Sequence, residues 1–212
     1  MCSDMTMAPA PTHPIDTKGH PIILIGLMGC GKSTVGKMLS KRTGMPLLDT
    51  DAIIEEQTGL SIPDIFREYG EAHFRSLETA LLRYLLEQKI QPAPVISTGG
   101  GIVVRPENRG ILRQLGFTVW LNVSVRTLLH RTRLSTNRPL LQSPDRHAIL
   151  SRLLSERRPY YREAAHYRLN SSRMDIPTVV SHVCHRAERF FERFTPNEPN
   201  NTPLVSDENI SG

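Results

Sequence analysis

The feature that most constrains this chain is a glycine-rich turn between a short apolar run and an amphipathic segment. Residues 26–33 read Gly-Leu-Met-Gly-Cys-Gly-Lys-Ser, fit the pattern G-x-x-x-x-G-K-[ST] and directly follow the apolar run Ile22–Ile25. Glycines let the backbone curl so that successive N–H groups face one centre, and the start of the next helix adds partial positive charge. The pattern therefore predicts a phosphate-binding loop. A glycine-rich turn with a coincidental lysine is the alternative, which the strand and helix context disfavours.

Residues Gly29 to Thr34 of this loop, Cys30 and Gly31 included, are expected to surround the phosphates of a nucleotide. Lys32 would reach the β- and γ-phosphates, and the Ser33 hydroxyl would bind Mg²⁺. Cys30 is either a thiol that is sensitive to alkylation or oxidation, because a helix start favours negative charge, or an inert buried residue. The loop does not select a reaction, because GTPases, ATPases and kinases share it.

Short apolar runs and longer amphipathic segments alternate along the chain. Strands are predicted over residues 21–26, 46–48, 94–97, 117–123 and 166–170. Helices are predicted from Lys32, after Thr50, over residues 71–88, from Pro106, after the cap residue Ser124 and from near Pro177. This alternation predicts a three-layer α/β fold, in which helices cover both faces of a five-stranded parallel sheet and ligands gather at the carboxyl ends of the strands.

The chain has 212 residues, which suits a single domain. Residues 1–20 and 195–212 are rich in Pro, Asn, Ser and Thr and lack periodicity, so we expect disordered extensions around a folded body of residues 21–194. Three scattered cysteines indicate a reducing, cytoplasmic setting. The sequence contains no apolar run long enough for a membrane span, and we expect a monomer with no membrane partner.

The formal net charge is +5, and residues 126–173 contain eleven arginines but no lysine. Arginine favours fork-like contacts with phosphate and carboxylate groups over a diffuse positive surface. We therefore expect small anionic ligands and no nucleic acid.

Two carboxylates, Asp49 and Asp51, follow the second predicted strand. If Asp49 ends that strand, one carboxylate can face the metal ion and the other an acceptor hydroxyl, which it could orient or deprotonate. The alternative is that Asp51 only caps the next helix.

Three further features point to an acceptor site. Arg75 lies off the apolar face of its predicted helix, where a solvated arginine is the ordinary interpretation. The third strand ends in Gly99, Gly100 and Gly101, which expose backbone N–H groups and permit close approach of a ligand. Arg138 lies in a predicted loop over residues 134–144, where it is either a lid residue over ATP or a solvated arginine.

These motifs resemble those of the shikimate kinase family in order and approximate spacing, from residue 22 to about residue 173. The matching segments are G-L-M-G-C-G-K-S-T from Gly26, L-D-T-D ending at Asp51, F-R-x-x-E with Arg75, the glycine run, N-R-P-L-L with Arg138, and E-R-R-P-Y-Y with Arg157. The proline in the last segment is expected to interrupt or kink its helix. Any one motif after the phosphate loop is weak, but the ordered set is specific.

The resemblance implies transfer of the γ-phosphoryl group of ATP to the 3-hydroxyl of shikimate, in the pathway to aromatic amino acids. It assigns Asp51 to the acceptor hydroxyls, Arg75 and Arg157 to the shikimate carboxylate, and Gly100 to a backbone contact with shikimate. On the nucleotide side it assigns Arg138 to the lid, Arg131 to the adenine, Arg173 to a further nucleotide contact and Asp49 to a water-mediated Mg²⁺ contact, with Ser97 as its helper. Two rivals stay open: another small-metabolite kinase, such as a gluconate kinase, and a non-catalytic nucleotide-binding relative.

Overall fold

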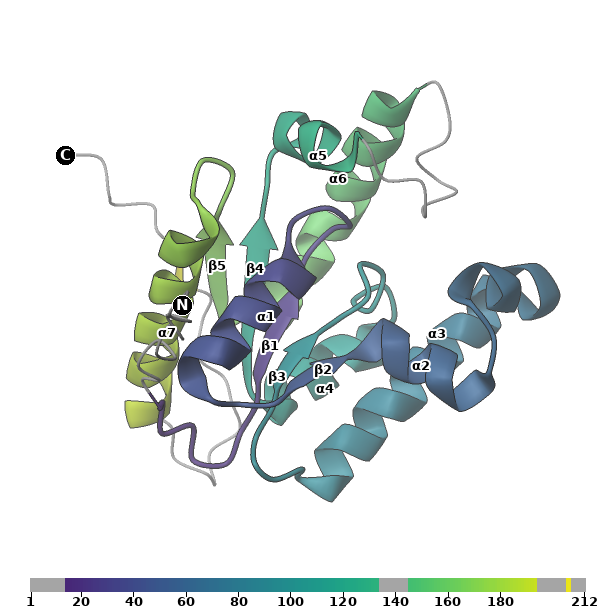
Figure 1. The fold of residues 1–212 in the computed structure, drawn as a ribbon. Helices are drawn as coiled ribbons and strands as arrows, with labels where there is room; N and C mark the ends of the chain where they lie inside the picture. Colours follow the sequence, from purple (N-terminus) through teal and green to yellow (C-terminus); the bar gives the residue numbers. More distant parts are fainter. Residues whose placement is uncertain (1–13, 134–144, 194–204, 207–212) are drawn as a thin grey trace, which may run out of the picture.

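The computed structural model describes residues 14–133, 145–193 and 205–206, which form a layered α/β body (Figure 1). The strands are β1 (Ile22–Ile25), β2 (Leu47–Asp49), β3 (Val95–Ser97), β4 (Phe117–Asn122), β5 (Tyr167–Asn170) and β6 (Val205–Ser206). The helices are α1 (Lys32–Thr43), α2 (Thr50–Thr58), α3 (Ile62–Gln88), α4 (Pro106–Leu115), α5 (Val125–Thr132), α6 (Arg146–Ala164) and α7 (Ile176–Glu192).

The strands form one sheet in the order β2-β3-β1-β4-β5-β6, and all of its pairings are parallel. The five predicted strands are present within a residue or two of their expected bounds. The two-residue β6 adds to β5 and comes from the segment that the sequence assigned to the C-terminal extension. In the register of the sheet, Ser97 pairs with Leu24 on one side and with Asp49 on the other. Polar strand ends are thereby brought together at one edge.

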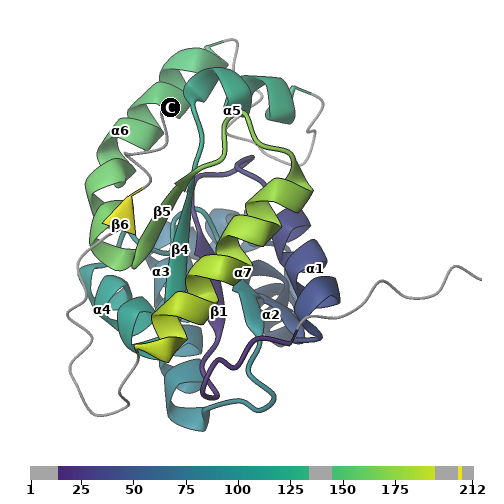
Figure 2. The same cartoon turned by 90° about the vertical axis from the view of Figure 1, so that its left-hand side faces the viewer.

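Two apolar layers cover the sheet, and the central strand β1 contributes to both. Ile22 and Leu24 belong to one buried cluster, which includes residues of α1 and α7, while Ile23 and Ile25 belong to the other, which includes residues of α3 and α4. Figure 2 shows α7 and α1 on the same side of the sheet. Because all four residues of β1 are fully buried, the strand is apolar throughout, as expected of a central parallel strand.

Two helices differ from their predicted form. Helix α3 begins nine residues before its predicted start at Glu71, with a break at Gly70, where φ is 79° and ψ is 169°. The predicted segment is therefore the part of α3 after the break. Helix α6 continues through Pro159 to Ala164, so the expected interruption at that proline does not occur.

Residues 14–20, which the sequence assigned to the N-terminal extension, lie against the body. Thr17 is buried, Ile15 packs against the core, and the Gln91 side chain donates to the Gly19 carbonyl at 2.9 Å. No helix in the described ranges is both long enough and apolar enough to cross a membrane.

Two glycines, one inside α4 and one directly after it, test how closely the start of β4 packs against the residue before β1. A Cβ on Gly116 would lie 2.1 Å from the Pro21 carbonyl oxygen, whereas a Cβ on Gly110, inside α4, meets nothing within 4 Å. We expect Gly116→Ala to lower the free energy of unfolding by about 2–3 kcal/mol through steric overlap. Gly110→Ala should raise it by about 0.5–1 kcal/mol, because alanine restricts the unfolded chain. Urea denaturation of both variants measures the two shifts, and a destabilised Gly110→Ala would contradict the packing described.

Candidate active site

The phosphate loop connects β1 to α1 and leaves the first turn of the helix without a side-chain cap. The N-cap residue Gly31 has a φ of 104°, which favours glycine, and glycine has no side chain that could cap the helix. In contrast, α2, α3, α5, α6 and α7 each begin with an Asp or Ser side chain that accepts a backbone N–H. The N–H groups of α1 are therefore available to an anion, as the motif predicts.

The side chains of the loop meet the carboxyl ends of β2 and β3. Lys32 is buried, and its Nζ donates to the carbonyls of Gly26 at 2.7 Å and Leu27 at 3.3 Å. The exposed Ser33 hydroxyl donates to Asp49 Oδ2 at 3.4 Å and lies 3.5 Å from the Ser97 hydroxyl. Three side-chain oxygens therefore lie together beside the phosphate loop, and oxygen atoms are the ligands that Mg²⁺ prefers.

A pocket of about 570 Å³ opens beside the phosphate loop and is lined by Gly29, Gly31, Lys32, Ser33, Thr34, Arg131, Met174, Asp175 and Ile176. Arg131 lies between the loop and the segment after β5, because it donates to the Cys30 carbonyl at 3.0 Å and to the Ser171 carbonyl at 3.4 Å.

Arg173 is exposed and is not one of the lining residues. The Cys30 side chain is only 2% exposed, in agreement with the alternative of a buried residue.

The two carboxylates at the junction of β2 and α2 differ in their contacts. Asp49 caps α2, since its Oδ1 accepts the backbone N–H of Asp51 at 3.1 Å. Asp51 lies in the first turn of that helix, so the alternative that Asp51 is merely the helix cap is wrong. Its Oδ1 is buried and has no hydrogen-bond partner within the described part of the chain.

Arg75 is buried at 9% exposure, so its interpretation as a solvated arginine is also wrong. Its Nη1 donates to Glu78 Oε2 at 2.8 Å, and its Nη2 donates to Glu71 Oε1 at 2.7 Å. Phe66 and Phe74 lie against the guanidinium group, at 6.0 and 5.4 Å from Cζ to the ring centroids. Helix α3 thus presents a fixed cation with acidic partners on two sides.

The glycine run after β3 is where these groups converge. A Cβ on Gly99 would lie 2.5 Å from Asp51 Oδ1 and 2.9 Å from Glu78 Oε1, and a Cβ on Gly101 would lie 2.3 Å from both terminal nitrogens of Arg75. A Cβ on Gly100 would lie 3.1 Å from the backbone nitrogen of Met28 in the phosphate loop. Side chains at Gly99 and Gly101 would displace the charged groups and one at Gly100 would press on the phosphate loop, so the run has a steric reason to be glycine.

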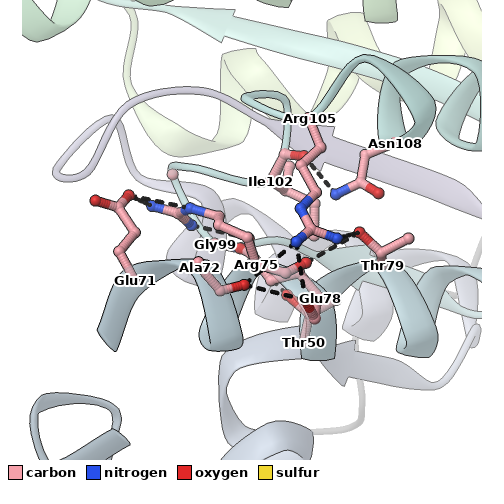
Figure 3. A network of polar contacts seen from close by, with 12 residues as sticks. Thr50, Glu71, Ala72, Arg75, Glu78, Thr79, Gly99, Ile102, Arg105 and Asn108 are labelled. Atoms are coloured by element: carbon pink, nitrogen blue, oxygen red, sulfur yellow. Dashed lines mark hydrogen bonds and ion pairs between the residues drawn. The ribbon is translucent and has the colours of Figure 1, made fainter. Parts of the chain in front are cut away.

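A polar network holds the glycine run against α2, α3 and α4 (Figure 3). The Gly99 N–H donates to the Thr50 hydroxyl at 3.1 Å, and Asn108 Nδ2 donates to the Ile102 carbonyl at 2.9 Å. Arg105 Nη2 donates to the Ser76 hydroxyl at 2.8 Å and to the Ala72 carbonyl at 3.2 Å. The turn of α3 that contains Arg75 is thereby fixed relative to the loop.

Helix α6 reaches the same run from the other side. Arg157 Nη1 donates to the Gly100 carbonyl at 3.0 Å, and the Tyr161 hydroxyl donates to the same oxygen at 2.6 Å. The structure therefore brings the predicted residues Asp51, Arg75 and Arg157 to one glycine run. Arg138 lies outside the described residues.

Burial alters the proton affinity of both acids beside Gly99. It raises the pKa of Asp51, and the charge of Asp49 adds to this effect while Lys32 opposes it. Burial also raises the pKa of Glu78 to about 6, although the charge and hydrogen bond of Arg75 oppose the shift. Both carboxyl groups are thus easier to protonate than their exposed counterparts.

The family profile for shikimate kinase matches residues 28–188, which is more than half of the chain. The chain belongs to the shikimate kinase family. It is 42% identical to the shikimate kinase of Thioalkalivibrio sulfidiphilus over 192 residues, which cover 90% of this chain and 99% of that one. It is also 42% identical to the shikimate kinase of Nitrosomonas europaea over 182 residues, which cover 85% of each chain.

Solved structures of the shikimate kinase family have the same fold. A structure of the Acinetobacter baumannii shikimate kinase in complex with shikimate aligns with a TM-score of 0.74 at 37% identity, over 83% of this chain and 96% of that one. The Bacteroides thetaiotaomicron enzyme aligns with a TM-score of 0.71 at 32% identity, over 82% and 98% of the two chains. The predictions of a P-loop α/β fold and of a shikimate kinase are confirmed.

Two residues of this shikimate kinase site were not predicted as site residues. Glu78 lies three residues after Arg75 in the F-R-x-x-E segment, a spacing that puts both side chains on one helix face, and this signal could have identified it. Tyr161 lies four residues after Arg157 on α6 and could have been found in the same way. Both contacts depend on the position of the glycine run, which helix spacing alone does not reveal.

The raised pKa of Glu78 predicts a pH dependence of stability. The folded state takes up this proton at about pH 6 and the unfolded state at about 4.5, so the contribution of Glu78 to the free energy of unfolding should fall as pH rises between these values and stay level above. The free energy of unfolding of the wild type minus that of Glu78→Gln should fall by about 2 kcal/mol as pH rises through this window, because glutamine does not titrate. Urea denaturation from pH 4 to 7 measures it, and Glu71→Gln controls for the loss of an Arg75 partner. A constant difference would contradict the assignment.

Proposed function

We propose that this chain transfers the γ-phosphoryl group of ATP to the 3-hydroxyl of shikimate, with the residue roles given below. The observation that carries this proposal is the position of the glycine run between two sites. Gly100 lies against the backbone of the phosphate loop at Met28, while its neighbours lie against Asp51, Glu78 and Arg75. A donor phosphate and an acceptor hydroxyl bound on the two sides of this run would be neighbours, which is the arrangement that phosphoryl transfer needs.

On the donor side, the uncapped start of α1 binds the phosphates of ATP and Lys32 moves from the loop carbonyls to the β- and γ-phosphates. Ser33 would bind Mg²⁺ directly and Asp49 through water, with Ser97 beside them. When bound, the metal ion would neutralise charge on the transferred phosphoryl group. The pocket beside Arg131 takes the adenosine, and we assign Arg138 to closure over the nucleotide and Arg173 to a peripheral contact.

On the acceptor side, Arg75 and Arg157 hold the carboxylate of shikimate, and Gly100 contributes a backbone contact. Asp51 Oδ1 and Glu78 Oε1, which have no hydrogen-bond partner among the residues that the structure describes, face Gly99 and can accept hydrogen bonds from the ring hydroxyls. Asp51 accepts the proton of the reacting hydroxyl, and burial, by raising the pKa of this carboxyl group, makes it a better base. We also propose that the protein is a monomer and is located in the cytoplasm.

A coupled assay of ADP release tests the substrate assignment. We expect release that depends on shikimate in a panel that also contains quinate, gluconate and nucleoside monophosphates, because two arginines converge with two acids on one acceptor site. Turnover of gluconate but not shikimate would favour the rival metabolite kinase. ATP binding without any shikimate-dependent release would favour a non-catalytic protein.

Asp51→Asn separates the two halves of the site. We expect turnover to fall by about 10²–10⁴-fold, because an amide cannot accept the hydroxyl proton, while the affinity for ATP stays nearly unchanged. Steady-state kinetics and ATP titration measure the two effects. Glu56→Gln, which changes an exposed acid on the same helix, is the matched control and should alter neither. Unchanged turnover in Asp51→Asn would remove Asp51 from the chemistry.

A further inference from the structure

The carbonyl group of Gly100 is held by two side chains of one helix. Tyr161 donates from its hydroxyl at 2.6 Å, and Arg157, one helical turn earlier, donates from Nη1 at 3.0 Å. The peptide bond is planar and trans, so an anchored Gly100 carbonyl fixes the N–H of Gly101, which points the opposite way across the same plane. Three successive glycines have no Cβ atoms to restrict their backbone, so hydrogen bonds must set the orientation of these peptide planes.

Tyr161 is itself held in a fixed position. Its ring is fully buried and stacks on Trp120 of β4, with 5.6 Å between ring centroids and 22° between the ring planes. The Arg168 guanidinium group lies over Trp120, 5.3 Å from the ring centroid. Burial raises the pKa of the Tyr161 hydroxyl, so this group stays protonated and remains a donor at any physiological pH.

We propose that Tyr161 is a positioning residue of the acceptor site, whose hydroxyl sets the Gly100–Gly101 peptide plane and so leaves Arg157 free to bind the substrate carboxylate. The proposal rests on the proposed function, in which Arg157 binds shikimate. Without the hydroxyl, Arg157 would be the side chain left among the described residues to hold the Gly100 carbonyl, and this bond from Nη1 would restrict how the remaining N–H groups of the guanidinium turn toward the substrate carboxylate. The effect should therefore fall on shikimate and not on ATP.

Tyr161→Phe tests this proposal, because it removes the hydroxyl and keeps the ring on Trp120. We expect kcat/KM for shikimate to fall about tenfold, mainly through KM, the size expected from the loss of one buried hydrogen bond. The KM for ATP should change less than about twofold, since the hydrogen bond that is removed ends on the Gly100 carbonyl and not on a residue assigned to ATP. Tyr160→Phe removes a hydroxyl from the adjacent tyrosine, whose ring lies against Arg109, and should leave both constants unchanged.

Two measurements separate positioning from a general loss of structure. The emission spectrum of Trp120, the single tryptophan of the chain, reports whether the ring stack persists, and the thermal midpoint reports overall folding. With both preserved, an unchanged shikimate KM in Tyr161→Phe would overturn the proposal. An equal loss of affinity for ATP would also overturn it. So would failure of Tyr161→Phe to fold, because the hydroxyl would then contribute to general stability and not to the acceptor site. A wild-type protein inactive on shikimate would instead overturn the proposed function.

Discussion

The parallel pairing of β1 with β3 is the constraint on which the rest of the site depends. It places the phosphate loop after β1 next to the glycine run after β3, and the pairing of β3 with β2 adds Asp49 and Asp51 to the same edge. Because parallel strands end at the same edge of a sheet, groups distant in the sequence meet without any long loop. The apolar side chains of β1 on both faces hold this arrangement, since moving the strand would expose two cores at once.

A second constraint is charge. Glu78, Arg75 and the Oδ1 atom of Asp51 are buried around the glycine run, and an uncompensated buried charge would be costly. Arg75 offsets Glu78 directly, whereas Asp51 has no hydrogen-bond partner at Oδ1 among the described residues. The hydroxyl group of an acceptor could donate a hydrogen bond to this oxygen. Part of the affinity for such a ligand would then come from the hydrogen bond that it supplies to Asp51 Oδ1.

The sequence was sufficient to predict five strands of the sheet, the phosphate loop and the family, because strand runs and the loop motif are local patterns, whereas β6 was not predicted. It did not predict the burial of Arg75 or the involvement of Glu78. Helical periodicity places Arg75 off the apolar face of α3, but that helix also packs against the glycine run, and tertiary packing created a second buried face. The helix through Pro159 was missed for a similar reason, since contacts of Tyr161 and Ala164 with the core outweigh the local preference of proline.

A site for two anionic ligands restricts how its backbone can be held. A cation used to anchor the Gly100 carbonyl is partly neutralised and directed away from substrate, whereas a tyrosine hydroxyl anchors the same oxygen and adds no charge. The two donors from α6 divide these tasks: Tyr161 is fully buried against Trp120, and Arg157 remains partly exposed beside the glycine run. The uncharged donor therefore lies on the core side of the carbonyl, where a cation would be expensive to bury. The charged donor lies where it can turn toward a ligand.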